Sequence, residues 1–413
     1  MLQVEEAQSR VMAEVTVGAA ENVALDDSLG RVLREDVIAT HDLPGADNSA
    51  MDGYAVRAAD VANAVADAVA NAPVTLPVIA DIPAGHPTDL HLQPGTAMRI
   101  MTGAFVPAGA DAVVQVEWTD GGTERVRIDK PVKRGASIRR RGEDMHAGDV
   151  VLRGGVRIGP AEISILASAG KARVQVGRRP TVAILSTGDE LVEIGETPAP
   201  GKIVNTNGSL LAALVRETGA IARPLGIVRD TREATIAAFD EASESDFVIS
   251  SGGVSVGAFD FVKEALDALG AETKFWRVSM KPGKPVVLSR LRDRLVFGLP
   301  GNPVSCFVSF HLFVAPALRK AMGQETALHA PIVRAQLTAP VKGAPERRVY
   351  ARVQVSVRDG ALLATPLASQ SSGALTSMLA ANGLAVLAEG THGEEGAEVD
   401  VVLFGLPTPT PPR

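Results

Sequence analysis

The sequence contains very little cysteine and few aromatic residues. Its 413 residues include one cysteine, Cys306, and only 4% Phe, Trp and Tyr. A single cysteine cannot form an internal disulfide, which fits a reducing cytoplasm. With so few aromatic rings but 46% hydrophobic residues, the cores are expected to consist of aliphatic side chains with closely approaching backbone segments.

A surplus of basic charge is also missing. Lys and Arg total 41 against 48 Asp and Glu, so the net charge is −7, which argues against nucleic-acid or anionic-membrane partners. The start of the chain has neither the basic residues nor the apolar middle of a secretory signal. The most apolar stretch, 306–318, contains His311 and Pro316 and is too short to span a bilayer. We therefore expect a cytoplasmic protein.

The chain is long enough for two to four domains, and its pattern changes three times. Apolar residues at helical spacing begin the chain, and short strand-like runs separated by Gly and Pro follow. Strands and helices then alternate, and a final β pattern turns at Asp359-Gly360. These changes predict a multi-domain protein of class α/β plus β. Its expected parts are a helical and extended linker domain (1–45 and 140–178), a β-rich domain (46–139), an α/β domain (179–328) and a small C-terminal β domain (329–413).

The α/β segment has the alternation of a doubly wound, mainly parallel sheet. Asp230 and Glu233 are expected to form a capping pair at the start of one of its helices. Ligands of such sheets gather at the carboxyl ends of the strands. The expected strands are 181–185, 224–228 and 246–250, and the expected helices are 207–219, 231–242 and 260–270.

Several loops that should lie at this edge of the sheet consist of small residues. The clearest is SSGGVSVGAFD, in which Ser251, Gly252, Gly253, Ser255 and Gly257 leave the backbone accessible. Small side chains let backbone N–H groups approach a ligand, and a following helix N-terminus favours negative charge. We therefore predict an anion-binding loop. The alternative is that each loop is only a turn, which becomes less attractive when several such loops share one edge.

Three acidic residues, Glu190, Asp230 and Asp260, each precede an expected helix. They could simply cap these helices. They could instead hold Mg²⁺, which prefers one or two carboxylates together with phosphate oxygens. The sequence has no His and Cys cluster, so a zinc site is not expected.

Basic residues of two kinds could face an anion. Lys281 and Lys284 flank a Pro-Gly turn, so their ammonium groups can point to one place. The run Arg139, Arg140 and Arg141 could be an anion-facing patch or a solvated surface, and both interpretations stay open.

An ordered set of motifs resembles the molybdopterin molybdenumtransferase family, which includes the bacterial MoeA proteins and the E domain of gephyrin. The motifs are NSAMDGYAV, RIMTGA, RRGED, STGDEL, SSGGVSVGAFDFVK, MKPGKP and GLPGNPVS. The resemblance covers nearly the whole chain and is weakest in the last β domain.

The resemblance implies a reaction in which molybdate and adenylylated molybdopterin give molybdenum cofactor and AMP. It also implies dependence on Mg²⁺, four domains and a homodimer with a cleft shared between subunits. Transient contact with other proteins of the pathway would fit. A molybdopterin adenylyltransferase and a non-catalytic, gephyrin-like scaffold are the alternative functions.

The resemblance further implies site residues. Arg277 stands where the family often has a lysine, and Gly373 stands where it often has a histidine. Cys306 is expected to be a buried structural thiol. The implied catalytic residues are Asp52, Thr102, Asp144, Glu190, Asp230, Asp260 and Lys281; the implied metal ligands are Glu190, Asp230 and Asp260; and the implied substrate-binding residues are Ser251, Gly252, Gly253, Ser255, Gly257, Arg277, Lys284, Pro300, Pro303, Arg352 and Ser372.

Overall fold

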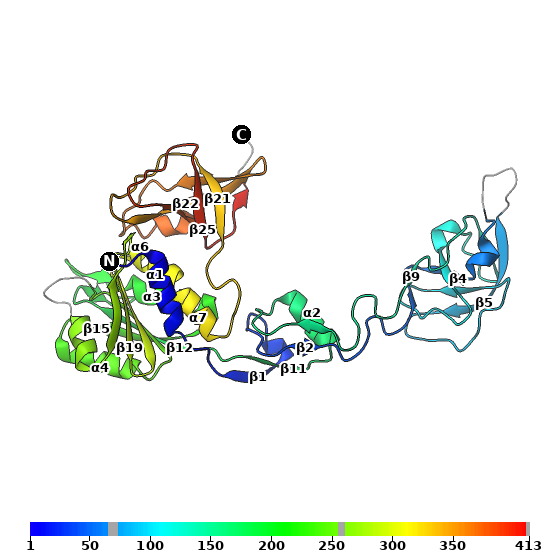
Figure 1. The fold of residues 1–413 in the computed structure, drawn as a ribbon, viewed down its shortest axis with the longest axis horizontal. Coiled ribbons are helices and arrows are strands. Elements are labelled where there is room, and N and C mark those ends of the chain that lie inside the picture. The colour runs from blue at the N-terminus through cyan, green and yellow to red at the C-terminus, as the bar shows by residue number, and fades with distance from the viewer. Residues whose placement is uncertain (65–72, 255–260, 410–413) are drawn as a thin grey trace. The chain divides into compact units, whose positions relative to one another are not determined.

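The protein is described in a computed structural model that covers residues 1–64, 73–254 and 261–409 (Figure 1). The chain divides into two compact units, and each is described by itself. The large unit comprises Met1–Glu35, Gly154–Pro160 and Arg173–Arg413. The small unit comprises Asp36–Arg153 and Ala161–Ala172.

The small unit is built on a five-stranded sheet in the order β7-β4-β6-β5-β8. Along β4, Tyr54 and Val56 belong to one buried cluster and Ala55 to another, so side chains cover both faces of the sheet. The strands are β4 (Gly53–Val56), β5 (Val74–Ile82), β6 (Ala97–Ile100), β7 (Ala112–Gln115) and β8 (Arg125–Ile128), with 3₁₀ helices η2 (Ala58–Val61) and η3 (Val116–Trp118).

Two short strand pairs and one helix complete this part of the chain. Strand β2 (Val37–Ile38) pairs with β10 (Val150–Leu152), and β3 (Asn48–Ser49) pairs with β9 (Ile138–Arg139). Helix α2 (Pro160–Ser168) starts at a proline, whose fixed φ suits the first turn of a helix, and is followed by Gly170 with a positive φ of 76°.

In the large unit, helix α1 (Val4–Glu14) buries the predicted apolar face, including Val4, Ala7 and Val11. It is followed by β1 (Ala20–Ala24), η1 (Leu25–Asp27) and later β11 (Arg173–Gly177), and β1 pairs with β11 in antiparallel register.

The centre of the large unit is a six-stranded sheet in the order β15-β12-β16-β20-β19-β17. The pairs β15–β12, β12–β16 and β16–β20 are parallel, and β19 and β17 are antiparallel additions at one side. The predicted doubly wound, mainly parallel sheet is therefore confirmed. Its strands are β12 (Thr181–Thr187), β15 (Ile221–Val228), β16 (Phe247–Ser251), β17 (Glu272–Arg277), β19 (Pro285–Leu291) and β20 (Arg294–Leu299).

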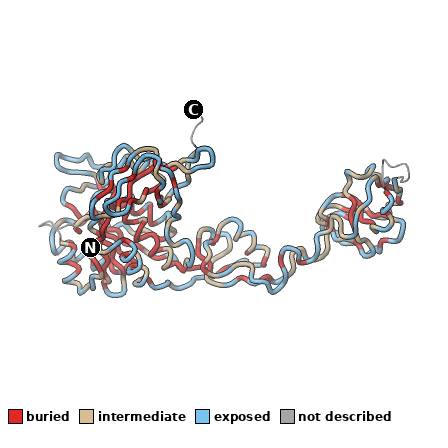
Figure 2. Tube along the Cα trace, turned by 45° about the horizontal axis from the view of Figure 1, so that its top comes forward, coloured by how far each residue is buried: buried red, intermediate tan, exposed pale blue. Residues whose placement is uncertain are grey.

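Helices cover both faces of this sheet, because alternate residues of each strand point to opposite sides. In β12, Val182 and Ile184 belong to the core that includes residues of α1, α3, α6 and α7, whereas Ala183 and Leu185 belong to the core formed with α4 and α5. Figure 2 shows the buried residues concentrated in this part of the chain. The helices between the strands are α3 (Thr206–Thr218), α4 (Arg232–Ala242) and α5 (Phe261–Ala268), and a two-stranded pair is formed by β13 (Leu191–Val192) and β14 (Ile203–Val204).

The most apolar part of the sequence forms one continuous helix, Pro303–Ala321, made of α6 (Pro303–Ser309), a π-helical turn η4 (Phe310–Val314) and α7 (Ala315–Ala321). With 19 residues it is longer than the apolar stretch suggested, and by length and composition it could cross a membrane. Most of it is buried inside the protein, which is the position of a core helix.

The C-terminal part of the large unit is a seven-stranded sheet. The predicted hairpin turns at Asp359 and Gly360, which have φ values of 50° and 79°, as a two-residue hairpin turn requires. The elements are β18 (Met280–Lys281), β21 (Ile332–Leu337), β22 (Arg348–Arg358), β23 (Ala361–Pro366), α8 (Ser377–Ala380), β24 (Gly383–Leu387), β25 (Glu398–Leu403) and β26 (Thr408–Pro409).

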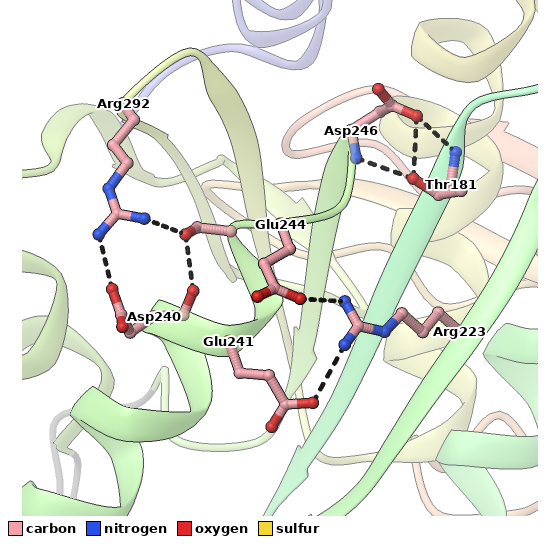
Figure 3. Close-up of polar contacts among 8 residues, drawn as sticks. Thr181, Arg223, Asp240, Glu241, Glu244, Asp246 and Arg292 are labelled. Atoms are coloured by element: carbon pink, nitrogen blue, oxygen red, sulfur yellow. Dashed lines mark hydrogen bonds and ion pairs between the residues drawn. The ribbon is translucent and has the colours of Figure 1, made fainter.

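Ion pairs and hydrogen bonds fasten the amino-terminal edge of the six-stranded sheet (Figure 3). Asp246, just before β16, accepts hydrogen bonds from the backbone N–H and the hydroxyl of Thr181 at 2.8 and 2.9 Å. It also pairs with Arg178 at 2.6 Å. Arg292 contacts Asp240 at 2.6 Å, while Arg223 reaches the two acids Glu241 and Glu244 near the end of α4. These four carboxylates therefore have cationic partners.

Candidate active site

The opposite edge of the six-stranded sheet surrounds a cavity of about 510 Å³. The sequence prediction that several small-residue loops meet at the carboxyl ends of the parallel strands is confirmed, since each loop contributes to the wall. The predicted site residues in the wall are Glu190, Asp230, Ser251, Gly252, Gly253, Pro300 and Pro303.

Two glycines after β16 give the cavity its shape. Gly252 and Gly253 have φ values of 90° and 64°, and a Cβ on Gly252 would lie 2.6 Å from the carbonyl oxygen of Thr187. Only glycine fits this approach without moving the backbone. The Gly252 N–H, however, donates to Leu299 O at 3.1 Å, so this amide is not free to bind an anion. Ser255 and Gly257, which belong to the same predicted loop, lie outside the described residues.

Sequence reasoning did not single out Asn207, which lines the same cavity. Its Nδ2 donates to Gly301 O at 2.7 Å and to Ser251 Oγ at 2.8 Å. Because a carbonyl oxygen can only accept, the amide nitrogen must face Gly301, and this fixes the orientation of the side chain. Its Oδ1 is buried and has no hydrogen-bond partner among the described residues. The side chain of this cavity-lining residue therefore keeps an unused hydrogen-bond acceptor. The only sequence signal was its place in the small-residue loop NTNGS.

Acidic residues at the cavity lie close to one another, so their negative charges repel. The backbone N–H of Asp189 donates to Asp230 Oδ2 at 3.2 Å, and the N–H of Asp230 donates to Asp189 Oδ1 at 3.3 Å. Burial raises the pKa of Asp230 above its usual value, and the charges of Asp189 and Glu190 raise it further, against the lowering effect of the hydrogen bond from Asp189. A cation near these carboxylates would remove this repulsion.

The capping pair expected at Asp230 is wrong, and so is the capping alternative for Glu190. The N-cap of α4 is Thr231, whose hydroxyl accepts from the N–H of Ala234 at 3.3 Å, while Asp230 bonds to Asp189 instead. Glu190 precedes strand β13 and not a helix. The short hydroxyl side chain of Thr231, one residue closer to α4, reaches the helix amide and leaves Asp230 outside the helix.

The described residues contain no group of three or more His, Cys, Asp and Glu side chains that could hold a metal ion. Glu190 and Asp230 both line the cavity, and two carboxylates with phosphate oxygens are a common Mg²⁺ environment. The third predicted ligand, Asp260, lies outside the described residues.

The predicted basic residues lie elsewhere on the large unit. Arg277, Lys281 and Lys284 are exposed, and within the described ranges none belongs to the cavity wall or forms an ion pair. The turn that carries the lysines is closed by a hydrogen bond from Val278 N–H to Lys284 O at 3.1 Å, and the next residue, Pro285, lines the cavity.

Two predicted substrate-binding residues, Arg352 and Ser372, are connected through one loop of the C-terminal part. Arg352 in β22 is fully buried, and its Nη2 donates to Ser369 O and Ser371 O at 2.8 and 3.0 Å. Burial lowers the pKa of Arg352. The same loop continues to Ser372, whose carbonyl accepts from Val304 N–H at 3.1 Å, beside the cavity-lining Pro303. Arg352 therefore contacts the loop backbone, and the loop contacts the start of α6.

The small unit holds the remaining predicted acids. The backbone N–H and the hydroxyl of Thr102 donate to Asp52 Oδ1 at 2.7 and 2.8 Å, and these hydrogen bonds lower the pKa of Asp52. Asp144 is exposed, and its backbone N–H donates to Leu43 O at 3.0 Å. The structure thus brings Asp52 and Thr102 together.

The arginine run of the small unit is largely paired internally. Arg140 contacts Asp47 and Arg141 contacts Asp42, each at 2.5 Å, and Arg139 is exposed in β9. Two of the three guanidinium groups thus hold the surrounding loops together.

Cys306 is buried in α6, and burial raises the pKa of its thiol to about 12. A thiol with such a pKa is protonated at neutral pH and is not a nucleophile, so the expectation of a structural thiol is confirmed.

Comparison with known proteins shows which family this chain belongs to. The MoeA N-terminal region (domain I and II) matches residues 2–170, a probable molybdopterin binding domain matches 183–320, and the MoeA C-terminal region (domain IV) matches 334–404. The chain is 40% identical over 407 residues to the molybdopterin molybdenumtransferase of Bacillus subtilis strain 168, covering 97% of this chain and 94% of that protein. The chain belongs to the MoeA family.

Other members of the MoeA family agree over the same length. A molybdopterin molybdenumtransferase of Staphylococcus epidermidis is 36% identical over 404 residues, covering 97% of this chain and 95% of that protein. The crystal structure of a molybdopterin biosynthesis MoeA protein from Pyrococcus horikoshii OT3 covers 98% of this chain and all of its own, with 30% identity and a TM-score of 0.84. The predicted family and multi-domain fold are thus confirmed, and the cavity described above lies within the region matched by the probable molybdopterin binding domain.

Proposed function

We propose that this protein inserts molybdenum from molybdate into adenylylated molybdopterin and releases AMP, a late step of molybdenum cofactor biosynthesis. The observation that carries the proposal is the 510 Å³ cavity, with its acids and its fixed acceptor, in a chain that belongs to the MoeA family. The cavity has the size of a cofactor site, and its polar groups converge from loops of one sheet edge.

Asn207 supplies the recognition of the heterocycle in this proposal. Its unpartnered Oδ1 accepts a hydrogen bond from an N–H group of the pterin. A phosphate oxygen, which only accepts, is disfavoured at this point, so the phosphate is directed to another part of the cavity. Gly252 and Gly253 leave the space for the ligand because they carry no side chain.

Glu190 and Asp230 are the proposed ligands of Mg²⁺, with Asp260 as the third predicted ligand. The raised pKa of Asp230 fits this role, since its carboxylate lies among like charges that a cation would neutralise. Bound there, Mg²⁺ would stabilise negative charge on the departing AMP. Asp189 orients Asp230 through their reciprocal hydrogen bonds.

The exposed cations Arg277, Lys281 and Lys284 are proposed to attract molybdate and the phosphoanhydride by charge. Lys281 keeps its proposed catalytic role in this scheme. Arg352 positions the loop that ends at Ser372 against α6. Asp52, Thr102 and Asp144 of the small unit remain proposed catalytic residues, and Ser251, Pro300 and Pro303 remain proposed substrate contacts.

We further propose that the enzyme is a cytoplasmic homodimer with a cleft shared between subunits. The four-part division into 1–45 with 140–178, 46–139, 179–328 and 329–413 remains a prediction that limited proteolysis can test. Sedimentation should give a dimer at micromolar concentration, and a fully active monomer would contradict this assembly.

The function is tested by incubating the purified protein with adenylylated molybdopterin and Mg²⁺, with and without molybdate. We expect AMP release only when molybdate is present, together with a product that activates a molybdenum-free apoenzyme. AMP release that ignores molybdate, or formation of adenylylated molybdopterin from ATP, would contradict the proposal, and the second result would identify an adenylyltransferase.

A further inference from the structure

A second cavity of about 590 Å³ lies in the large unit, and it shares no lining residue with the first. Its wall comes from Arg157 in the segment Gly154–Pro160, the end of α3, the helix Pro303–Ala321, the segment before β21 and the segment that includes the end of β25 and the residues after it. Cavities of this size accommodate small organic ligands. No role for these residues follows from the function proposed above.

The charge of this cavity is unbalanced. Arg157 and Arg319 both line it, and within the described ranges neither forms an ion pair with a carboxylate. Arg319 Nη1 donates to Leu328 O at 2.7 Å, which uses one of the five N–H donors of a guanidinium. Burial lowers the pKa of Arg319, Arg157 lowers it further by repulsion, and Glu217 acts in the opposite direction. Two guanidinium groups and one carboxylate leave a net positive wall.

Aromatic side chains form another part of the wall. The ring of His311 stacks on Phe404, with centroids 5.2 Å apart and an interplanar angle of 27°. Phe310 adds a second aromatic wall. Burial, together with the smaller effect of the positive charge of Arg319, lowers the pKa of His311 to about 4. This ring is therefore neutral at pH 7 and adds no charge. Its Nε2 is buried without a hydrogen-bond partner among the described residues.

We propose that this cavity binds a small organic anion consisting of a phosphate or carboxylate group attached to a flat apolar ring. The anionic group pairs with Arg157 and Arg319, because guanidinium groups bind the oxygens of such anions through paired hydrogen bonds. The ring lies among Phe310, His311 and Phe404. The inference does not depend on the molybdenum chemistry of the first cavity.

Calorimetric titration of the full-length protein tests the proposal with four probes: phenyl phosphate, benzoate, inorganic phosphate and benzyl alcohol. We expect phenyl phosphate or benzoate to bind, and whichever binds more tightly distinguishes a phosphate ligand from a carboxylate ligand. Inorganic phosphate and benzyl alcohol should each bind at least about tenfold more weakly, since each lacks one half of the ligand. Equal affinity for inorganic phosphate and phenyl phosphate would overturn the assignment of the aromatic wall.

Three variants locate the binding. Arg157→Gln and Arg319→Gln should each weaken the tighter probe about tenfold. Arg216→Gln makes the same change at an exposed position near the end of α3, outside the cavity wall, and should leave the affinity unchanged. Because Arg319 also holds Leu328, the exposed Arg157 provides the test if the Arg319 variant fails to fold. Unchanged affinity in Arg157→Gln would overturn the proposal.

The NMR signals of histidine rings in the cavity wall provide a second test of binding at this cavity. The ring signals of His311 and His329, assigned with His→Gln variants, should shift when phenyl phosphate or benzoate is added, and this shift should be lost in Arg157→Gln. Binding that leaves both histidine signals in place would mean that the probe occupies another site, such as the first cavity, and would contradict the proposal.

Discussion

At the two edges of the six-stranded sheet, the pKa values of two acidic residues are shifted in opposite directions. At the amino-terminal edge, Asp246 is partly buried, which by itself raises its pKa, but hydrogen bonds from Arg178 and Thr181 outweigh burial and lower it. At the carboxyl edge, burial and the neighbouring acids raise the pKa of Asp230, and its hydrogen bond from Asp189 does not reverse this. Both carboxylates stand beside strands of the same sheet, yet of the two only Asp246 has a cationic partner among the residues that the structure describes.

This difference distinguishes charges that stabilise the fold from charges that we propose take part in function. An acid whose partners are all supplied by the fold contributes to stability, as Asp246 does by joining β16 to the start of β12. An acid held among like charges lowers stability unless something binds there. The like charges at the carboxyl edge are the reason that we propose a cation site there and assign the chemistry to this edge.

The largest expected effect is the difference between replacing a glycine at the carboxyl edge and replacing one at the amino-terminal edge. Gly252 at the carboxyl edge and Gly219 before β15 both have positive φ values. A Cβ on Gly252 would lie 2.6 Å from Thr187 O, whereas on Gly219 it would meet only the end of the Met322 side chain, with Cε and Sδ both at 3.6 Å. Gly219→Ala should cost about 1 kcal/mol and keep activity, while Gly252→Ala should cost more than about 2 kcal/mol and abolish AMP release. Urea unfolding and the AMP assay test this, and equal costs would contradict the role assigned to the close approach.

The second prediction separates charge from capping at the start of α4. Asp230→Asn should reduce molybdate-dependent AMP release at least about tenfold. It should unfold at or slightly above the wild-type temperature, because it removes repulsion with Asp189 and Glu190. Added Mg²⁺ should restore part of the activity. Thr231→Ala is the control: it should lose about 1 kcal/mol of stability and keep its activity. Full activity of Asp230→Asn at low Mg²⁺ would remove this acid from the site.

The third prediction is the converse at the amino-terminal edge. Asp246→Asn keeps an oxygen for Thr181 but loses the ion pair with Arg178, so it should cost about 1.5 kcal/mol of stability. Its specific activity, measured well below the unfolding temperature, should equal that of the wild type. A loss of activity without a loss of stability would erase the distinction between the two edges.

The smallest effect is a pH dependence of opposite sign. Because the folded pKa of Asp230 is raised, its stabilising contribution is complete below its unfolded pKa and is lost as pH rises through the folded value. Because the folded pKa of Asp246 is lowered, its contribution is present above its unfolded pKa and is lost as pH falls through the folded value. Carboxyl NMR titrations should show the pKa of Asp230 above and that of Asp246 below the ordinary Asp value of 3.8, and Mg²⁺ should lower only the pKa of Asp230. Identical titrations would refute the comparison.

Much of the fold could be predicted because it is encoded locally. The apolar spacing of Val4, Ala7 and Val11 gave α1, and the two residues Asp359 and Gly360 gave the hairpin between β22 and β23. Alternating apolar runs and helical periods predicted the parallel sheet, and the strands of such a sheet bring their following loops to one edge. The ordered motifs predicted the family for the same reason, since each is a short stretch with its own backbone requirement.

The hydrogen-bond partners of the site could not be predicted in this way. Position relative to a helix suggested that Asp230 is a cap, but the actual cap is Thr231 and the partner of Asp230 is Asp189, 41 residues away. Gly252 looked like a donor to an anion, but Leu299 on the neighbouring strand already accepts from its N–H.

The sequence by itself determined the order of strands and helices, the glycine-rich turns and the membership of the MoeA family, because each depends on residues close together in the chain. Only the tertiary structure decided which polar groups remain available. The side-chain oxygen of Asn207 keeps its accepting capacity unused among the described residues because Gly301, 94 residues away, accepts from its nitrogen, and Arg352 is buried because β22 lies inside the C-terminal sheet. A side chain can bind a ligand only with the hydrogen-bonding capacity and charge that its folded neighbours leave unused, and those neighbours are set by packing between distant segments.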